Sequence, residues 1–396
     1  MSELDQLLAD AVERQDIPFA VAMVANREGT LWQGSAGKAS ASIEAGPQTL
    51  FRIFSMTKAI GALAAMIVVD RELLSLDAPV VSVLPEFGEI QVLEKLGLDG
   101  PVLRPPRRPV TLRHLLTNTA GFAYEAWNKK QAIWQMVTGA AHPVTGTLAS
   151  LMSPLMFDPG EDFAYSHSFD WIGPIVERLD GRKIERFCQD EIFDPLGMID
   201  TAFEPDFARE RLAGVRLRGA DGGFCDFELS PTPHPEVYGM GQALYSTAPD
   251  YIRFLRAILN GGELDGHRVI SVGTTEFMMT GQMGDMEMPV LKSIAPLLSA
   301  DFDPCPGAPK TWTAGFVRNQ TDMPGMRSAG SLCWAGFLNT HYWVDPASDL
   351  AAVLMTQSLP FGDVRFMEAY GAFERAAYRA FGSASALDAM GVAGSV

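Results

Sequence analysis

The sequence predicts an α+β protein in which an antiparallel sheet is flanked by the two terminal helices and accompanied by a mostly helical lobe. Three observations indicate this class. Apolar residues recur at helical spacing at both ends of the chain, strand-like runs follow the first helix and precede the last, and the long middle segment is rich in proline and short helical stretches. We expect a cleft between the two lobes, which is a common place for chemistry.

The first elements are a helix, a hairpin and a second helix. Leucine and valine recur at helical spacing over residues 3–15. Apolar runs at 19–26 and 30–37 flank a glycine-containing turn, which predicts a β-hairpin. Residues 56–71 are rich in Ala, Met and Ile and contain no proline, which predicts a buried helix that begins near Ser55.

The remaining elements divide the chain into two lobes. Later predicted elements are a helix over 249–259, strands over 313–319, 334–344 and 350–355, and a helix over 364–381. We expect an α/β lobe formed by 1–71 and 236–382, a helical lobe formed by 72–235, and a loose tail at 383–396.

Composition and charge exclude several classes of partner. The chain has 48 acidic and 31 basic residues and a formal net charge of −17, and such a surface repels phosphate backbones and anionic lipid. We therefore expect neither a nucleic-acid nor a membrane partner. Residues 1–5 show no export signal and the cysteines form no CxxC, so we expect a cytoplasmic protein with free thiols. The oligomeric state is unknown from the sequence.

The pattern S-x-x-K occurs twice, and only one copy begins an apolar helix. Ser35 and Lys38 follow a strand, whereas Ser55 and Lys58 stand one helical turn apart on one face. The helix N-terminus can stabilise an oxyanion, and burial lowers the pKa of a lysine towards that of a working base. A simpler interpretation of the spacing is a capping serine beside a lysine that extends to solvent.

A tyrosine forms the second candidate group. Tyr165 lies in a loop that leads into an apolar helical stretch, so its hydroxyl can point into a cleft. A phenol beside an ammonium loses its proton more easily and can relay protons. The alternative is a buried tyrosine that packs and forms one hydrogen bond.

Four segments in a fixed order resemble the serine β-lactamases of the class C type, with the related DD-peptidases and carboxylesterases. These segments are Phe51–Lys58, Thr111–Gly121, Pro159–Ser166 and Pro195–Met198. The chain is most similar to the esterase branch, the family VIII esterases. The resemblance implies a β-lactamase/transpeptidase-like fold without a cofactor. It also implies that Ser55 is the nucleophile and that Lys58 and Tyr165 are the family's catalytic lysine and tyrosine, which form the acid–base pair.

Two departures from the lactamase pattern bear on the substrate. The family's Lys-Thr-Gly falls on Trp334-Ala335-Gly336, so the lysine that recognises a carboxylate is missing and Trp334 would offer an apolar surface. His167 stands where a Tyr-x-Asn motif has its asparagine, and substrate contact and a structural role are both open for it. Both departures favour an uncharged ester over a penicillin or a D-alanyl peptide.

The resemblance also suggests an oxyanion hole and a pocket. The backbone N–H groups of Ser55 and Phe337 would hold the oxyanion. Tyr124, Trp127 and Trp312 are either pocket walls or core residues. The six histidines show no metal-ligand spacing, and neither G-x-S-x-G nor a nucleotide-binding glycine motif occurs, so we expect no metal and no cofactor.

Together these patterns predict a serine carboxylesterase that hydrolyses small or short-acyl esters through an acyl-enzyme on Ser55, with Lys58 and Tyr165 as the acid–base pair. The expected partner is a small-molecule ester. Three alternatives stay open: a β-lactamase or DD-peptidase, an acyltransferase that uses the same acyl-enzyme, and a non-catalytic binding protein that kept the fold.

Overall fold

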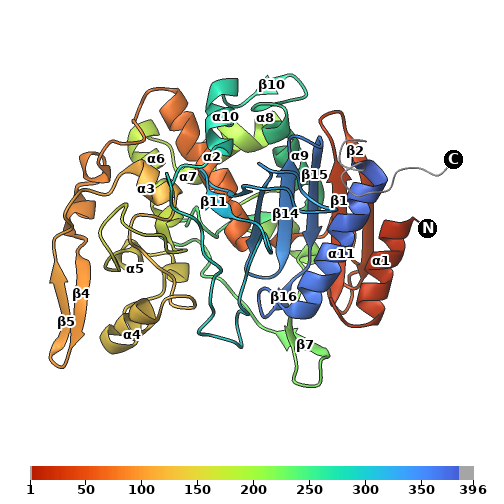
Figure 1. The fold of residues 1–396 in the computed structure, drawn as a ribbon, viewed down its shortest axis with the longest axis horizontal. Helices are drawn as coiled ribbons and strands as arrows, with labels where there is room; N and C mark the ends of the chain where they lie inside the picture. Colours follow the sequence, from red (N-terminus) through yellow and green to blue (C-terminus); the bar gives the residue numbers. More distant parts are fainter. Residues whose placement is uncertain (1, 383–396) are drawn as a thin grey trace.

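The computed structural model describes residues 2–382, so the predicted tail at 383–396 lies outside the described residues. Its centre is a seven-stranded antiparallel sheet (Figure 1). In spatial order the strands are β11 (Lys310–Trp312), β12 (Val317–Asn319), β13 (Leu332–Gly336), β14 (Thr340–Asp345), β15 (Leu350–Met355), β1 (Phe19–Ala25) and β2 (Thr30–Gly37). The pairing of β15 with β1 joins the two ends of the chain, and the predicted antiparallel sheet is confirmed.

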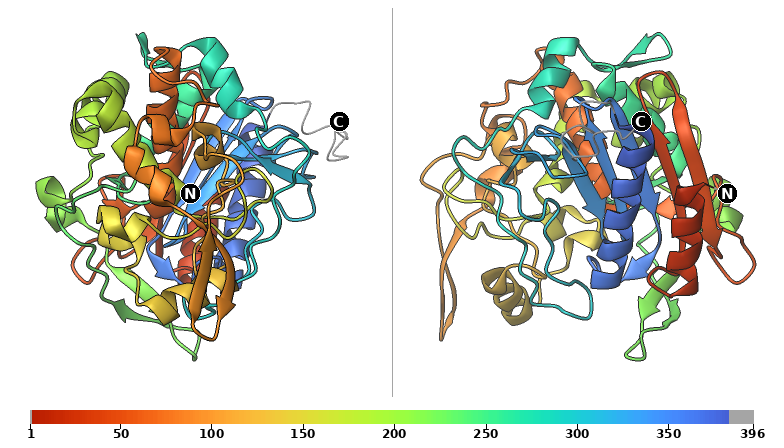
Figure 2. Two further views of the ribbon diagram at one scale, coloured as in Figure 1. Left: turned by 90° about the vertical axis from the view of Figure 1, so that its left-hand side faces the viewer. Right: turned by 45° about the vertical axis from the view of Figure 1, so that its right-hand side comes forward.

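Helices cover the sheet and form most of the second lobe. They are α1 (Glu3–Glu13), α2 (Thr57–Asp70), α3 (Leu112–Leu116), α4 (Lys129–Thr138), α5 (Leu148–Leu151), α6 (Ile172–Asp180), α7 (Ile184–Cys188), α8 (Asp194–Leu196), α9 (Ala248–Leu259), α10 (Val272–Met279) and α11 (Val364–Phe381). Figure 2 shows α1 and α11 side by side on one face of the sheet. Helix α9 packs on the opposite face, against β15, β1 and β14.

The alternation of side chains along β14 explains why both faces are buried. The ring of Trp343 lies 5.8 Å from Tyr370 of α11, measured between ring centroids. The neighbouring Tyr342 points the other way and lies 5.2 Å from Tyr251 of α9. Successive strand residues face opposite sides of a sheet, so each face of β14 buries an aromatic side chain against a helix.

One strand prediction is wrong in a way that affects the site. The run 334–344 is not a single strand, because the chain reverses after β13 and returns as β14. Asn339 adopts a φ of 60°, and its N–H donates to the oxygen of Gly336 at 3.0 Å, which closes the turn. Asparagine tolerates this left-handed conformation better than most residues. The short strand β11 was not predicted, and β12 begins four residues later than expected.

The second lobe lies to the left in Figure 1 and contains α3–α7 with one hairpin that was not predicted. The shorter strands are β3 (Phe51–Arg52), β4 (Val92–Gly97), β5 (Gly100–Arg104), β6 (Val215–Arg218), β7 (Phe224–Phe227), β8 (Tyr245–Ser246), β9 (Glu263–Leu264), β10 (His267–Arg268) and β16 (Ser358–Leu359). Strands β4 and β5 pair as the hairpin, whereas β6 pairs in parallel with β16. The lobe boundaries at residues 71 and 235 stay a prediction. One hydrophobic core extends through both lobes.

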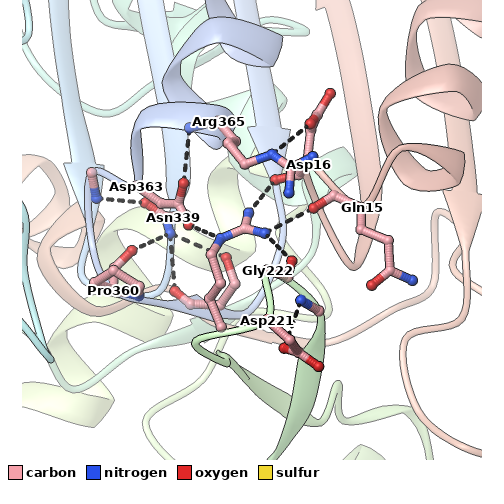
Figure 3. A network of polar contacts seen from close by, with 12 residues as sticks. Gln15, Asp16, Asp221, Gly222, Asn339, Pro360, Asp363 and Arg365 are labelled. Atoms are coloured by element: carbon pink, nitrogen blue, oxygen red, sulfur yellow. Dashed lines mark hydrogen bonds and ion pairs between the residues drawn. The ribbon is translucent and has the colours of Figure 1, made fainter.

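A network of polar contacts joins the β6–β7 hairpin to both terminal helices (Figure 3). The guanidinium of Arg218 donates to the backbone oxygens of Gln15 and Asp16, each at 2.8 Å, and forms an ion pair with Asp363. Arg365 of α11 also contacts Asp16 at 3.1 Å. These contacts fix the ends of α1 and α11 against the hairpin.

None of the helices described over residues 2–382 combines the length and the apolar character needed to cross a membrane.

Candidate active site

Ser55 lies at the start of α2, where β3 runs into a short 3₁₀ turn over Phe54–Met56. One turn later the Nζ atom of Lys58 lies 3.2 Å from the Ser55 Oγ atom. Phe54, directly before the serine, has a φ of 41°, which is strained for a bulky residue. Such strain is tolerated where the surrounding structure enforces it, and it frequently marks functional sites.

The ammonium group of Lys58 is enclosed by three hydrogen-bond partners and three aromatic rings, those of Tyr124, Tyr165 and Phe169. Besides Ser55, its Nζ contacts the hydroxyl of Tyr124 at 3.2 Å and the backbone oxygen of Gly241 at 3.0 Å. It also lies 4.8 Å from the ring centroid of Tyr165. Burial lowers the pKa of Lys58 to about 7, because the charged form loses its solvation. A large fraction of this lysine is therefore a neutral amine near neutral pH.

Tyr165 occupies the other side of the serine. Its hydroxyl oxygen accepts a hydrogen bond from the indole N–H of Trp334 at 3.2 Å. Burial raises the pKa of Tyr165 above its ordinary value, although contacts with the Ser55 hydroxyl and the Trp334 N–H oppose this rise. This direction is opposite to the one expected from a nearby ammonium alone. The phenol is thus protonated at neutral pH and is suited to donate a proton.

Asp170 is a buried carboxylate of this site that the sequence analysis did not identify. It lies on the 3₁₀ turn before α6, and its Oδ1 atom accepts the N–H of Gly241 at 2.8 Å. The backbone oxygen of the same glycine accepts a hydrogen bond from the Lys58 ammonium, so Gly241 connects the charged groups of Asp170 and Lys58. Burial raises the pKa of Asp170 to about 6, while the charge of Lys58 opposes the rise.

The glycine between these charges fits only without a side chain. A Cβ atom on Gly241 would lie 2.6 Å from Asp170 Oδ1 and 3.2 Å from Lys58 Nζ, and a Cβ on Gly239 would lie 2.5 Å from the same carboxylate oxygen. The sequence contains a signal for this arrangement: Asp170 is an acidic residue at the start of an apolar helix, and Gly239 and Gly241 are two glycines separated by one residue.

A cavity of about 390 Å³ opens beside Ser55 and Tyr165. Its apolar lining residues are Phe54, Ala126, Trp127, Val144, Phe227, Leu229, Pro231, Leu298, Phe337 and Leu359. Its other lining residues are Tyr124, Glu125, His142, Ser230, Thr232 and Gln242. No lysine or arginine is among these described lining residues, so the wall suits an apolar ligand with few polar groups.

Two of the predicted substrate-contacting residues line this cavity, together with Phe337, whose backbone N–H was predicted to bind the oxyanion. Tyr124 and Trp127 do so, and Tyr124 also binds Lys58. The ring of Phe337 faces Trp127 edge-on at 6.4 Å. The turn that carries Phe337 is fixed by Asn339, whose side-chain amide donates to Pro360 O at 3.0 Å (Figure 3).

Trp334, His167 and Gly336 lie behind the cavity wall. Trp334 is 2% exposed and contacts Tyr165 instead of the cavity. His167 is fully buried, and its Nε2 atom lies 3.1 Å from the hydroxyl of Ser153. A Cβ on Gly336 would lie 2.2 Å from the oxygen of Ile53, so this glycine lets β13 approach the turn before Ser55.

The remaining sequence candidates lie away from the serine or in the core. Ser35 is on β2, the last strand of the sheet, and Lys38 pairs with Glu44 on the surface at 3.6 Å. Trp312 is buried, and its indole N–H donates to the oxygen of Leu116 at 3.0 Å. The four cysteines are free thiols. Over residues 2–382 no three His, Cys, Asp or Glu side chains gather in a group that could hold a metal ion.

Comparison with known proteins gives a consistent result. Residues 4–377 match the profile of the Beta-lactamase family. Protein Rv1367c of Mycobacterium tuberculosis (strain H37Rv) is 30% identical over 359 residues, covering 86% of each chain. The lovastatin esterase of Penicillium rubens is 28% identical, and the match covers 77% of this chain and 78% of the esterase. The monacolin J acid methylbutanoyltransferase of Aspergillus terreus is also 28% identical, and the match covers 83% of this chain and 81% of the transferase.

Solved structures share the fold. The LovD6 mutant of the simvastatin synthase LovD from Aspergillus terreus superposes with a TM-score of 0.81 at 23% identity, covering 96% of this chain and 94% of that one. EstCE1, described as a hydrolase with promiscuous acyltransferase activity, gives a TM-score of 0.70 at 20% identity, with 94% and 100% covered.

Proposed function

The chain belongs to the Beta-lactamase family of serine hydrolases and acyltransferases, and on that premise we propose that it is a serine carboxylesterase acting through an acyl-enzyme on Ser55. The observation that carries this proposal is the 3.2 Å contact between Ser55 Oγ and a buried Lys58 whose pKa is about 7. A serine beside a base of this strength is an activated nucleophile.

In the acylation step, neutral Lys58 takes the proton of Ser55 while the serine oxygen attacks the ester carbonyl. The backbone N–H groups of Ser55 and Phe337 hold the oxyanion, as proposed from the family pattern. As the C–O bond to the alcohol breaks, Tyr165 gives its proton to the departing alkoxide. The proton on Lys58 then restores the phenol, so charge and protons balance over the step.

In the deacylation step, water enters the cavity and attacks the acyl-enzyme carbonyl. Lys58 again accepts the proton from the attacking oxygen, and the returning proton releases Ser55 as the acid leaves. Lys58 and Tyr165 both contact Ser55, and the proposed proton transfers among these three residues require no cofactor.

The surroundings of the serine favour esters without a carboxylate near the scissile bond. Trp334 replaces the lysine that β-lactamases direct at the substrate carboxylate, and the cavity wall carries no lysine or arginine among its described residues. Arg327 cannot substitute for that lysine, because it is buried and paired with Glu374 at 2.8 Å. An anionic substrate would therefore lose solvation without gaining a partner.

Acyl transfer is the second candidate function. An alcohol that enters the same cavity in place of water would accept the acyl group, and the apolar wall favours such an alcohol. The methylbutanoyltransferase relative, at 28% identity, supports this candidate as directly as the esterase relative supports hydrolysis.

A substrate panel tests both candidates. We expect measurable turnover of short-acyl 4-nitrophenyl esters, abolished by Ser55→Ala, with catalytic efficiency far above that on penicillins and a chromogenic cephalosporin. Comparable efficiency on both classes would contradict the esterase proposal. Adding apolar alcohols to the ester assay and quantifying the new ester against the free acid gives the ratio of transfer to hydrolysis.

A further inference from the structure

Among the described residues that line the cavity beside Ser55, Glu125 carries the one carboxylate. Its neighbour Tyr124 binds Lys58, and Trp127, two residues further on, lies 5.3 Å from the ring of Tyr165. Glu125 is thus held on a loop whose position the catalytic groups themselves fix. About a third of its side chain is exposed, and Glu125 lines the cavity.

His142 holds this carboxylate in its charged form. The Nδ1 atom of His142 accepts the N–H of Val144 at 3.0 Å, so the neutral ring carries its proton on Nε2. That Nε2 lies 3.0 Å from Glu125 Oε1 and therefore donates to it. Burial has the largest single effect and would raise the pKa of Glu125, but the hydrogen bond and charge of His142, with the backbone N–H of Glu125 itself, together lower the pKa below its ordinary value.

The second carboxylate oxygen has remaining capacity to accept a hydrogen bond from a ligand, beside the backbone N–H of Glu125 itself, which also contacts the carboxylate. Over residues 2–382 the side chain of Glu125 is engaged by another residue only at Oε1. A half-buried carboxylate oxygen in an apolar cavity binds hydrogen-bond donors strongly and repels anions.

Charged side chains also line a separate recess. Arg52 lines a cavity of about 60 Å³ that adjoins the main one. Its guanidinium donates to the oxygen of Ala213 at 3.2 Å and lies 5.9 Å from the ring centroid of Tyr245. The arginine is therefore engaged away from the cavity that contains Ser55, and it does not neutralise Glu125.

We propose that Glu125 is a specificity subsite that binds a hydrogen-bond donor, a hydroxyl or an ammonium group, on an otherwise apolar ester. This inference rests on the proposed ester chemistry at Ser55 and names the class of substrate. The apolar wall holds the body of the ester, and Glu125 selects esters that carry a donor and rejects those that carry a carboxylate.

The test uses matched ester series. Each series has one apolar skeleton ending in a methyl, a hydroxyl, an ammonium or a carboxylate group, placed on the acyl chain in one series and on the alcohol in the other. At pH 8 the wild-type enzyme should use the hydroxyl and ammonium esters better than the carboxylate ester in at least one series. Relative to the methyl ester, Glu125→Gln should lower kcat/KM for the ammonium ester by about tenfold or more and raise it for the carboxylate ester.

Two further variants separate recognition from damage to the loop. His142→Asn keeps an acceptor for the Val144 N–H but shortens the side chain and displaces the donor from the position of Nε2 beside Glu125, so the preference for donor esters should persist or increase. Glu161→Gln removes a surface carboxylate paired with Arg107 at 3.6 Å and should leave the preference unchanged.

The two proposals fail in different ways. Turnover of the methyl ester and its loss in Ser55→Ala report on the ester chemistry alone. Binding of non-hydrolysable amide analogues, measured by calorimetry on Ser55→Ala with and without Glu125→Gln, reports on the subsite even where no ester is turned over. Equal affinity for all four analogues, or a donor preference that survives Glu125→Gln, would overturn the inference.

Discussion

Replacing Asp170 by asparagine should move the pH dependence of acylation towards acid. The amide keeps an acceptor for the Gly241 N–H but removes the negative charge that favours protonated Lys58. A unit charge about 5 Å away at an effective dielectric constant of about 20 contributes roughly 3 kcal/mol, or about two pKa units. We take about one to two units as the expected fall in the pKa of Lys58.

The direction of the shift in the pH–rate profile follows from the role of Lys58 as a base. The wild-type acylation rate should rise with pH as Lys58 loses its proton, around pH 7. Lowering that pKa in Asp170→Asn shifts the rising limb down by about one to two pH units. The plateau above it should fall, because a weaker base accepts the serine proton less readily.

The assay is the single-turnover acylation rate from pH 4.5 to 9 for wild type and Asp170→Asn. Asp250→Asn is the matched control, because Asp250 is also a buried aspartate whose pKa burial raises to about 6, and it contacts Thr201 instead of the site. If the rising part of the pH–rate profile stays at the same pH in Asp170→Asn, or shifts equally in Asp250→Asn, the electrostatic role of Asp170 is refuted.

Three further predictions test the catalytic contacts and the core. Tyr165→Phe and Lys58→Ala should each slow acylation by about 10²-fold or more. The double variant should be little slower than the slower single variant, because the two residues act as a unit. Multiplicative losses in the same single-turnover assay would show that the two residues act independently. Tyr124→Phe, which removes one of the contacts of Lys58, should cost less than Tyr165→Phe, and an equal or larger loss would make Tyr124 the principal proton donor. Glu374→Gln leaves the buried Arg327 unpaired, so guanidinium unfolding should show about 3–5 kcal/mol of lost stability, and a loss below about 1 kcal/mol would contradict this.

Periodicity predicted the fold well where it reflects burial on one face. The hairpin strands, β15 and α11 follow the predicted ranges closely because strong apolar runs and turn residues define them. The β13–β14 reversal was missed because the run 334–344 is apolar throughout and its turn depends on the left-handed Asn339. The β4–β5 hairpin was missed because its strands are largely exposed and give little apolar signal.

The candidate site was predictable only where sequence spacing determines geometry. Ser55 and Lys58 are one helical turn apart, so their contact follows from local structure. Asp170 and Gly241 are 71 residues apart, and their contact depends on how the start of α6 packs against the loop before β8. The position of Trp334 behind Tyr165 likewise depends on tertiary packing, which residue type alone does not determine.

The central claim is that Ser55 is the nucleophile, and mass spectrometry of the trapped acyl-enzyme tests it most directly. A slow ester or an active-site phosphonate should add one adduct to the peptide that contains Ser55. Labelling should disappear in Ser55→Ala and persist in Ser35→Ala, the serine of the other S-x-x-K pattern. An adduct that persists in Ser55→Ala, or one that is lost only in Ser35→Ala, would contradict the account.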